Sequence, residues 1–402
     1  MSAQLKVLHV ASWYPSEVHP SLGNFIERHV EAVATACEVE VWAPVPVRGS
    51  AGSVMKMREK NGTELREVEG QTFTVRRLYH EATRPQLVGV ARSVASTASK
   101  MDWTPDVVHV HVAYPAGSAA VAWAKKWGVP VVLTEHWTAY QDFGAVPWWR
   151  RRVIRDVVKR TDAVCPVSAD LGEAIAAAVP GMGTMHVVPN VVDTKRFKPA
   201  EDKTLAGVPV GATRRRLEGH AMERLLHVSS MNDDQKNITG LLEVLSPLFK
   251  ANPALKATFV GGEQARLDGH RSWVEAQGLE GRIVFTGPLE TDEVVEHMQT
   301  HDVLVLNSRR ENFPCVIAEA WACGIPVMST DVGGIREHLP PGLSERGFLL
   351  PAEAGEVEWQ KAWMQVGQTT WHEESLRAYA ETHFSMKAVG AAYKEVYLGL
   401  LG

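Results

Sequence analysis

The chain has 402 residues and a formal net charge of −5, with 45% hydrophobic and 22% charged residues. At about 150 residues per domain this length predicts two or three domains, and the ordinary composition excludes a disordered, collagen-like or coiled-coil chain as a whole. The acidic balance argues against nucleic acid as a partner, because nucleic-acid binders carry a basic excess. The four cysteines form no CxxC pair, which argues against a zinc site or a disulfide framework and is typical of a reducing compartment.

Features of membrane insertion or export are missing from the sequence. No apolar run approaches the ~18 residues that a membrane-spanning helix needs. The opening MSAQLKVLHVAS has one lysine and a short apolar stretch, which predicts a buried strand rather than a signal peptide. These features predict a cytoplasmic enzyme or binding protein.

In the first half of the chain, short β-branched runs alternate with amphipathic helical stretches. The predicted elements are, in chain order, strand 5–10, helix 24–36, strands 39–43 and 73–78, helix 85–100, strand 107–112, helix 116–127, strand 129–134, helix 148–160, strand 163–167, helix 169–178 and strand 185–188. Continuous apolar strands that alternate with helices are typical of a parallel sheet covered on both faces.

This rhythm breaks and then resumes. Residues 194–223 hold charges, glycine and proline without clean periodicity, which predicts a link between two domains. The later predicted elements are strand 225–229, helix 238–249, strand 256–260, helix 266–277, strand 282–285, helix 291–299, strand 302–306, helix 314–323, strand 326–329 and an amphipathic helix 386–401. The pattern predicts an α/β protein with two Rossmann-like domains facing a cleft, in which ligands bind at the carboxyl ends of the strands.

The strongest motif lies between Glu311 and Glu319, which are separated by NFPCVIA and follow a predicted strand. Pro314 suits the first turn of a helix, where its missing N–H costs nothing. The free amides of that turn suit phosphate oxygens, and carboxylates accept hydrogen bonds from sugar or ribose hydroxyls. The plainer interpretation is an exposed loop glutamate followed by a glutamate on a helix surface.

Three further sets of residues suit a ligand site by their position. Gly23 precedes a predicted helix, where glycine lets the backbone approach a ligand closely. Lys236 opens the first helix of the second half and can reach a pyrophosphate as a point charge. His9, His111 and His136 lie at or just past the ends of predicted parallel strands and so share one sheet edge. His109 shares the face of His111 but lies deeper, which suggests a structural role. Each alone could equally be an ordinary turn glycine, a solvated lysine or a loop histidine.

Taken together, these motifs resemble the retaining glycosyltransferases of family 4, which have the GT-B fold. The Glu-x7-Glu motif with AWACGIPVMSTDVGG after it is similar to the family signature. Other similar segments follow in order along the chain: HVASWYP…GNFIERHVEAVA, the strand ends at 106–111 and 134–136, VVPNVVDTKRF at 187–197, and DQKN at 234–237. The chain departs from the family where an arginine usually stands about five residues before the lysine, and Arg309 could take over that charge.

The resemblance implies roles for individual residues. It places the donor diphosphate against Gly23, Lys236 and the backbone of Phe313, Pro314, Cys315 and Val316. It places Glu319 on the ribose, and Glu311 and His136 on the transferred sugar. His111 is a second catalytic candidate. No DxD triplet occurs, so we expect neither a metal ion nor another cofactor, and Lys236 with the backbone amides would stabilise the leaving diphosphate.

The segment 147–160, PWWRRRVIRDVVKR, combines an apolar stripe with a basic surface. Arginines and lysines surround valines and an isoleucine at helical spacing, and Trp148 and Trp149 stand at its start. Basic flanks with interfacial aromatic residues suit an anionic membrane surface. A domain helix whose stripe packs on the sheet explains the same pattern, and both interpretations hold if the stripe faces the core while the arginines face lipid.

We therefore expect a retaining glycosyltransferase that moves a sugar from a nucleotide-diphosphate sugar to an acceptor hydroxyl. A polysaccharide or lipid-linked glycan is the default acceptor, and a peripheral position at the inner face of the cell membrane is consistent with 147–160. The resemblance implies an acceptor-side domain at 1–195, onto which the C-terminal helix 384–402 packs back, and a nucleotide-sugar domain at 196–383. The alternatives are a sugar-nucleotide epimerase or phosphorylase of the same fold, and a non-catalytic scaffold that binds sugar nucleotides.

Overall fold

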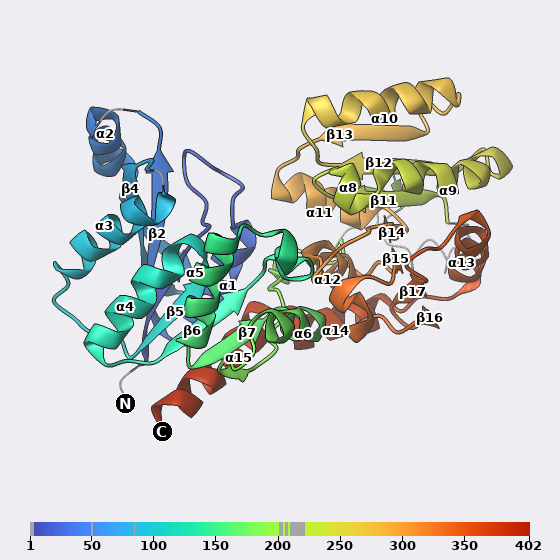
Figure 1. Cartoon of the computed structure of the whole chain (residues 1–402). Helices are drawn as coiled ribbons and strands as arrows, with labels where there is room; N and C mark the ends of the chain where they lie inside the picture. Colours follow the sequence, from blue (N-terminus) through green and yellow to red (C-terminus); the bar gives the residue numbers. More distant parts are fainter. Residues whose placement is uncertain (1–3, 50, 84, 201–203, 206–207, 210–221) are drawn as a thin grey trace. The chain divides into compact units, whose positions relative to one another are not determined.

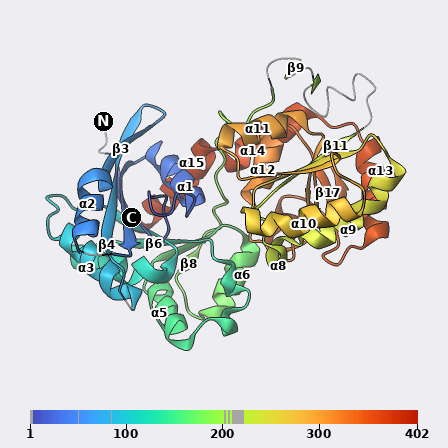
Figure 2. The ribbon, with the colours of Figure 1, turned by 90° about the horizontal axis from the view of Figure 1, so that it is seen from above.

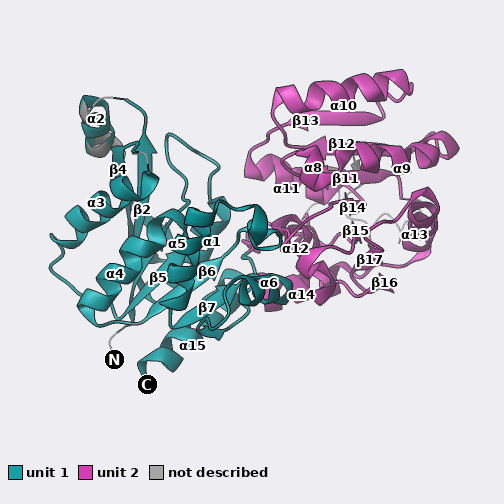
Figure 3. Ribbon diagram, viewed as in Figure 1, with its two compact units in different colours: residues 1–191, 385–402 teal, residues 192–384 magenta. Residues whose placement is uncertain are grey.

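The structure is a computed structural model that describes residues 4–49, 51–83, 85–200, 204–205, 208–209 and 222–402 (Figure 1). The chain divides into two compact units, which Figure 3 shows in different colours. Unit 1 comprises Met1–Val191 and Ser385–Gly402, and unit 2 comprises Val192–Phe384. The sequence-based division was placed after residues 195 and 383. The last helix of the chain thus belongs to the same unit as the first strand.

Unit 1 is built on an eight-stranded sheet with the order β3-β4-β2-β1-β5-β6-β7-β8. Its strands are β1 Lys6–Ala11, β2 Glu38–Val47, β3 Thr63–Val68, β4 Gln71–Glu81, β5 Val107–His111, β6 Val131–Glu135, β7 Ala163–Pro166 and β8 Thr184–Met185. All neighbours are parallel except β3 and β4. Continuous valine runs such as that of β5 suit these strands because both faces of the sheet are buried.

Two layers of helices cover this sheet. The helices are α1 Asn24–Ala34, α2 Ala51–Asn61, α3 Gln86–Ala98, α4 Ser118–Trp127, α5 Trp148–Lys159, α6 Ala169–Ala178 and α15 Met386–Leu401. Helices α3 to α6 pack on one face, and α1 and α15 pack on the other (Figure 2). A Cβ at Gly390 would clash with the carbonyl oxygen of Ala32, so glycine lets α15 lie directly against α1.

Unit 2 repeats the plan with a seven-stranded sheet in the order β13-β12-β11-β14-β15-β17-β16. Its strands are β11 Arg224–Val228, β12 Lys256–Val260, β13 Ile283–Gly287, β14 Val303–Leu306, β15 Val327–Thr330, β16 Gly342–Ser344 and β17 Gly347–Leu350. Only β16 and β17 pair antiparallel in this sheet. A separate two-stranded sheet joins β9 Thr204–Leu205 and β10 Val208–Pro209.

The helices of unit 2 also form two layers. They are α8 Asp233–Lys236, α9 Ile238–Ala251, α10 Gln264–Ala276, α11 Thr291–Thr300, α12 Cys315–Ala322, α13 Glu356–Gln368 and α14 Glu373–Phe384. Helices α9, α10 and α13 share one core with the sheet, and α11, α12 and α14 share the core on its other face. The fold class predicted from the sequence is confirmed: both units are α/β with mainly parallel sheets.

Some local predictions differ from the structure. The strand predicted at 185–188 is wrong, since β8 ends at Met185, although the amides of His186 and Val188 still donate to the β7 carbonyls. Elements α2, β3, β16, β17, α13 and α14 have no predicted counterpart. Most of the predicted link at 194–223 lies outside the described residues. None of the helices in the described part of the chain combines the length and apolar character that crossing a membrane requires.

Candidate active site

The carboxyl edge of the unit 2 sheet, where its parallel strands end, brings together two of the predicted donor residues. Lys236 closes the short helix α8 after β11, and Glu311 lies in the loop after β14. The Lys236 Nζ lies 2.5 Å from Glu311 Oε1. Both side chains are largely buried, with 15% and 6% exposed, so the pair is a desolvated, charge-assisted contact.

The loop that carries Glu311 is fastened on two sides. The Ser308 hydroxyl donates to Glu311 Oε1 at 2.7 Å, and the Gly334 amide donates to the Asn312 carbonyl at 2.6 Å. Gly333 has a φ of 58°, and a Cβ there would clash with the carbonyl oxygen of Glu311. The glycine pair noted in the sequence therefore allows the two loops to pack closely.

Helix α12 and the two residues before it supply the other residues of unit 2 that were predicted to bind the sugar-nucleotide donor. The helix begins at Cys315, and Pro314 is its N-cap. Pro314 was expected in the first turn, so it lies one position before the place predicted from the sequence. Phe313 is 2% exposed and packs against Phe384 and His338, so its side chain is core and only its backbone remains for a ligand. Glu319 lies inside the helix and is buried.

The position of the family's missing arginine is occupied by Met231. This residue is 1% exposed, has a φ of 54°, and receives the Ser229 hydroxyl at its sulfur. A cation close by is Arg309, whose guanidinium donates to the Asp233 carbonyl at 2.6 Å and whose amide donates to the Gln235 carbonyl. Arg309 is thus attached to the same short helix as Lys236.

In unit 1, Gly23 is the N-cap of α1 and has a φ of 76°. A Cβ at this position would come within 2.7 Å of the Trp13 backbone and 2.9 Å of the Tyr14 amide. Both the left-handed conformation and the close approach require glycine. The start of α1 also contacts a histidine of the predicted site: the ring centroid of Phe25 lies 4.7 Å from that of His136.

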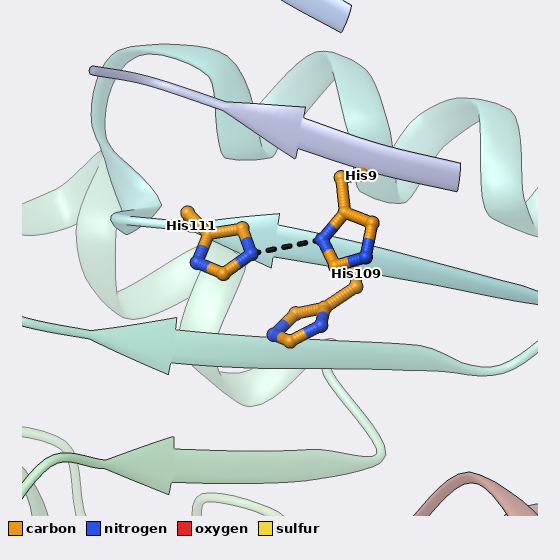
Figure 4. A group of neighbouring side chains, drawn as sticks. All are labelled: His9, His109 and His111. Atoms are coloured by element: carbon orange, nitrogen blue, oxygen red, sulfur yellow. Dashed lines mark hydrogen bonds between the residues drawn. The ribbon is translucent and has the colours of Figure 1, made fainter. Parts of the chain in front are cut away.

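Three histidines cluster within the unit 1 sheet (Figure 4). His9 Nδ1 and His111 Nε2 are 2.9 Å apart and share a hydrogen bond. His109 bonds to the Tyr397 hydroxyl at 2.6 Å and to Thr134 Oγ1 at 2.7 Å, so both of its ring nitrogens are used. His9 pairs in register with His109 inside β1 and lies deeper than the strand end at which the sequence analysis placed it.

A second layer of hydrogen bonds extends this cluster to α1 and α15. The Tyr393 hydroxyl and His29 Nδ1 share a hydrogen bond of 2.9 Å, and His29 Nε2 lies 3.2 Å from Asn190 Oδ1. Asn190 also hydrogen-bonds His136, whose ring lies 4.9 Å from that of His29. His111 and His136 stack with ring centroids 6.2 Å apart, so the two predicted catalytic histidines belong to one network.

Burial sets the charge of these groups. It lowers the pKa of His9 to about 3 and of His29 to about 4, and it lowers the pKa of His111 and His136 well below the usual value. Burial also raises the pKa of Glu135 to about 7, although the Ala113 amide and the Tyr140 hydroxyl donate to its carboxylate. At neutral pH the histidines are therefore uncharged and act as hydrogen-bonding groups.

The ring nitrogens of His9, His109 and His111 are the atoms that a metal ion would need as ligands. The ring nitrogens of His9, His109 and His111 lie within 4.8 Å of one another, and imidazole is a common ligand of transition metals. However, both nitrogens of His109 and the facing nitrogens of the other two are engaged in hydrogen bonds. The cluster as arranged fits a hydrogen-bonded network better than a ligand set, and the expectation of no metal stays a prediction.

The predicted site residues thus fall into two groups. Unit 1 holds Gly23, His111 and His136, and unit 2 holds Lys236, Glu311, Glu319 and the segment 313–316. Five further residues contact this set but were not predicted from the sequence: His29, Glu135, Ser308, Tyr393 and Tyr397. His29 had a signal in its helical spacing from the buried Ile26 and Val33, and Glu135 in its place between Thr134 and His136. The two tyrosines had none, because their partners are hundreds of residues away in sequence.

Two family models match the chain, one on each side of the predicted link. The model of Glycosyltransferase Family 4 matches residues 23–196, and that of Glycosyl transferases group 1 matches residues 223–366. The putative teichuronic acid biosynthesis glycosyltransferase TuaC of Bacillus subtilis (strain 168) is 28% identical over 343 residues, which cover 82% of each chain. A D-inositol 3-phosphate glycosyltransferase of Paenarthrobacter aurescens (strain TC1) is 26% identical over 318 residues, 74% of each chain.

Solved structures of similar fold cover nearly the whole chain. The sucrose-phosphate synthase of Thermosynechococcus elongatus has a TM-score of 0.73 and 17% identity, covering 99% of both chains. Anabaena HepE in complex with UDP-glucose has a TM-score of 0.69 and 19% identity, covering 98% of this chain and 100% of its own.

The two Rossmann-like units and their solved neighbours define the GT-B fold, and the two family models make the chain a glycosyltransferase. The family matches agree on a more specific assignment. The chain belongs to the group 1 glycosyltransferases of family 4.

Proposed function

We propose that the protein transfers a sugar from a nucleotide-diphosphate sugar to an acceptor hydroxyl with retention of the anomeric configuration. The observation that carries this proposal is the meeting of Lys236 and Glu311 at the carboxyl edge of unit 2. A phosphate-binding cation and a sugar-binding carboxylate in contact suit a ligand in which diphosphate and sugar are directly bonded. Ligands of open α/β sheets bind at this edge.

Each residue has a role in this reaction. Lys236 and the amides at the start of α12 hold the diphosphate, Glu319 holds the ribose, and Glu311 holds the sugar. From unit 1, Gly23 approaches the diphosphate, and His136 and His111 offer neutral imidazoles to the sugar. We infer a front-face route in which the leaving phosphate helps to deprotonate the acceptor hydroxyl, so that the protein supplies positioning and electrostatic stabilisation without a metal ion.

The solved relatives and the curated ones suggest candidates for the substrates. HepE was crystallised with UDP and with UDP-glucose, which makes uridine nucleotides the first donors to test. The names of two relatives refer to teichuronic acid biosynthesis and to D-inositol 3-phosphate. A polysaccharide or lipid-linked glycan remains the acceptor class that we propose.

Helix α5 is the proposed contact with an anionic membrane surface. Ile154, Val157 and Val158 are buried in the core, while Trp148 and Trp149 are 72% and 42% exposed. Exposed tryptophans beside basic residues suit the interface between lipid headgroups and water. This supports a peripheral position at the inner face of the membrane for a protein that works in the cytoplasm.

Product analysis tests the proposal directly. The protein is incubated with nucleotide sugars and a candidate acceptor, with and without EDTA, and the anomeric configuration of the product is read by proton NMR. We expect transfer with retention that survives EDTA. Inversion of the anomeric centre, or activity that chelation abolishes and Mg²⁺ restores, would overturn the proposed mechanism. Conversion of the donor into an epimeric sugar nucleotide without any acceptor would instead favour an epimerase.

A further inference from the structure

Unit 1 contains a cavity of about 150 Å³ that none of the roles above uses. Its walls come from the segments that follow β1 and β5, from the last residues of β2 and from the start of α3, and Arg150 of α5 adds to them. Among the lining residues, Trp13, Tyr14 and Tyr114 are aromatic, and Arg150 comes from the first turn of α5. Leu22, next to the ligand-binding candidate Gly23, also lines it. The cavity therefore lies beside the predicted acceptor-side residues.

Arg150 has unusual surroundings for an arginine. Its guanidinium lies 4.2 Å from the centre of the Tyr114 ring and 4.7 Å from that of Trp137, so two aromatic rings hold it in place. Its Nε is buried without a hydrogen-bond partner. Among the described residues, no carboxylate forms an ion pair with Arg150, whereas several other arginines of unit 1 are paired with glutamate.

A partly desolvated guanidinium without an anion is costly to maintain. Burial lowers the pKa of Arg150, which shows that the site disfavours an isolated positive charge. Arginine side chains in such places ordinarily pair with carboxylate or phosphate, because the planar guanidinium offers paired N–H donors. The stacking against Tyr114 and Trp137 fixes the orientation of this group before a ligand arrives, which reduces the entropy lost on binding.

We propose that this cavity binds an acidic group, a carboxylate or a phosphate monoester, of the sugar acceptor, and that Arg150 is its anchor. The inference rests on the proposed function, because it identifies the acceptor class of the same enzyme. Arg150 stacks on Trp137, which directly follows His136 in the sequence. An acidic group bound to Arg150 would therefore lie near His136, which is proposed to hold the transferred sugar. The aromatic walls suit the apolar face of a sugar ring.

The cavity and the proposed cation of the diphosphate belong to different units. The cation proposed for the diphosphate is Lys236, which belongs to unit 2, whereas every residue that lines the cavity belongs to unit 1. Arg150 was included in the basic surface expected to face lipid. Its stacked position in the cavity removes it from that surface and leaves the exposed tryptophans and the outer arginines.

Matched sugars that differ only in charge test the proposal. Binding of glucose, glucuronic acid and glucose 6-phosphate to the full chain is measured by saturation-transfer NMR. We expect the two acidic sugars to bind at least about tenfold more tightly than glucose, since a charged hydrogen bond contributes about 1.5–3 kcal/mol. Arg150→Gln should reduce their affinity to that of glucose. The stronger of the two acidic probes identifies the source of the charge, carboxylate or phosphate.

Two control variants and one substitute variant make the result specific. Arg92→Gln, at an exposed position of α3, should bind all three sugars as the wild type does. Lys236→Ala should also retain the acidic sugars, which excludes the donor phosphate site as their location. If thermal melting shows that Arg150→Gln does not fold, Arg150→Lys replaces it; it should bind the acidic sugars more weakly than the wild type while still preferring them to glucose.

The outcomes separate this inference from the proposed function. Equal binding of glucose and the acidic sugars, no binding of any probe, or loss of acidic-sugar binding in Lys236→Ala but not in Arg150→Gln would each overturn the acidic acceptor site. Calorimetry with UDP, GDP and ADP on the same samples reports on the donor site. If none of these nucleotides binds the wild type, the donor proposal fails, whatever the sugars do.

Discussion

Lys236 on α8 and Glu311 after β14 form an ion pair with 2.5 Å between Nζ and Oε1, although 75 residues separate them in the sequence. The lysine is the proposed cation for the diphosphate, and the glutamate is the proposed acceptor of hydrogen bonds from the sugar. In the protein without substrate each therefore neutralises the other. A donor that enters this site must share Lys236 with Glu311, so the pair sets both the charge and the orientation of the site.

The first prediction concerns the stability of unit 2. Lys236→Met leaves the Glu311 carboxylate buried without its cation, and Glu311→Gln leaves the ammonium without its anion. Breaking a buried pair typically costs about 3–5 kcal/mol, whereas replacing both partners together costs much less. Urea denaturation of the two single variants and the double variant should therefore show a double variant more stable than Lys236→Met. Additive losses would contradict a coupled pair.

The two glutamates of the motif should respond differently to substitution. Glu319 is proposed to hold the ribose equally in substrate and transition state, so Glu319→Ala should weaken nucleoside diphosphate binding by about 1.5–3 kcal/mol and raise KM. Glu311 is proposed to hold the sugar, whose charge changes during transfer, so Glu311→Ala should mainly lower kcat. Calorimetry with the nucleotide and steady-state kinetics check both. Nucleotide affinities in the opposite order would reverse the assignment.

The alternation of strands and helices, and the parallel sheets that it implies, could be predicted from the sequence because each strand is a continuous apolar run buried on both faces. The elements that were missed lack this signal. Strand β3 is an edge strand with Leu65 exposed, β16 is three residues long, and α2 exposes Met55 where an amphipathic helix would expose charge. Their positions depend on tertiary contacts rather than on local pattern.

The buried histidines predict a pH-dependent stability. The unfolded chain protonates them near pH 6.5, while the folded protein holds the pKa of His9 near 3 and of His29 near 4. Below about pH 6.5 the unfolded state thus binds more protons, and the free energy of unfolding should fall as the pH decreases. The urea midpoint should drop between about pH 7.5 and pH 5, and His9→Gln should flatten this drop. A midpoint that rises on acidification would contradict neutral buried histidines.

Glu135 contributes with the opposite sign. Its folded pKa of about 7 lies above the ordinary value of 4.5, so the folded state keeps a proton that the unfolded state loses between these values. This group therefore stabilises the protein as the pH falls through that window. Glu135→Gln should raise the urea midpoint near pH 8, where the wild type buries a charge, and should steepen the loss on acidification. A variant less stable than the wild type near pH 8, with an unchanged slope, would show that the carboxylate is stabilising.

Membrane association is predicted to depend on the exposed aromatic residues of α5. Trp148→Ser with Trp149→Ser should reduce co-sedimentation with vesicles that contain phosphatidylglycerol, and salt should weaken the binding of the wild type. Met364→Ser, on α13 of unit 2, is the matched control because Met364 is also exposed. Equal sedimentation of the tryptophan variant and the wild type would exclude α5 as the contact.

The candidate site could be predicted only in part from the sequence, because some of its contacts join residues that are far apart in the chain. Spacing along one segment identified Glu311 and Glu319, and strand ends identified His111 and His136. The hydroxyls that hold the histidines come from α15, where Tyr397 is 288 residues from His109 and Tyr393 is 364 residues from His29. No local pattern marks a tyrosine on a C-terminal helix as a partner of strands at the other end of the chain. That Arg150 has no carboxylate partner among the described residues likewise depends on the fold rather than on local sequence.

The central claim is that the protein uses nucleotide sugars through the Lys236 and Glu311 site. The most direct measurement is the release of nucleoside diphosphate from a panel of UDP-, GDP- and ADP-sugars, with and without acidic sugar acceptors, by the wild type and Lys236→Ala. We expect at least one donor to release its nucleoside diphosphate only when an acceptor is present. Lys236→Ala should reduce this release by about two orders of magnitude, because a charged contact to the leaving group is lost. Release at the same rate in wild type and variant, or from no donor at all, would contradict it.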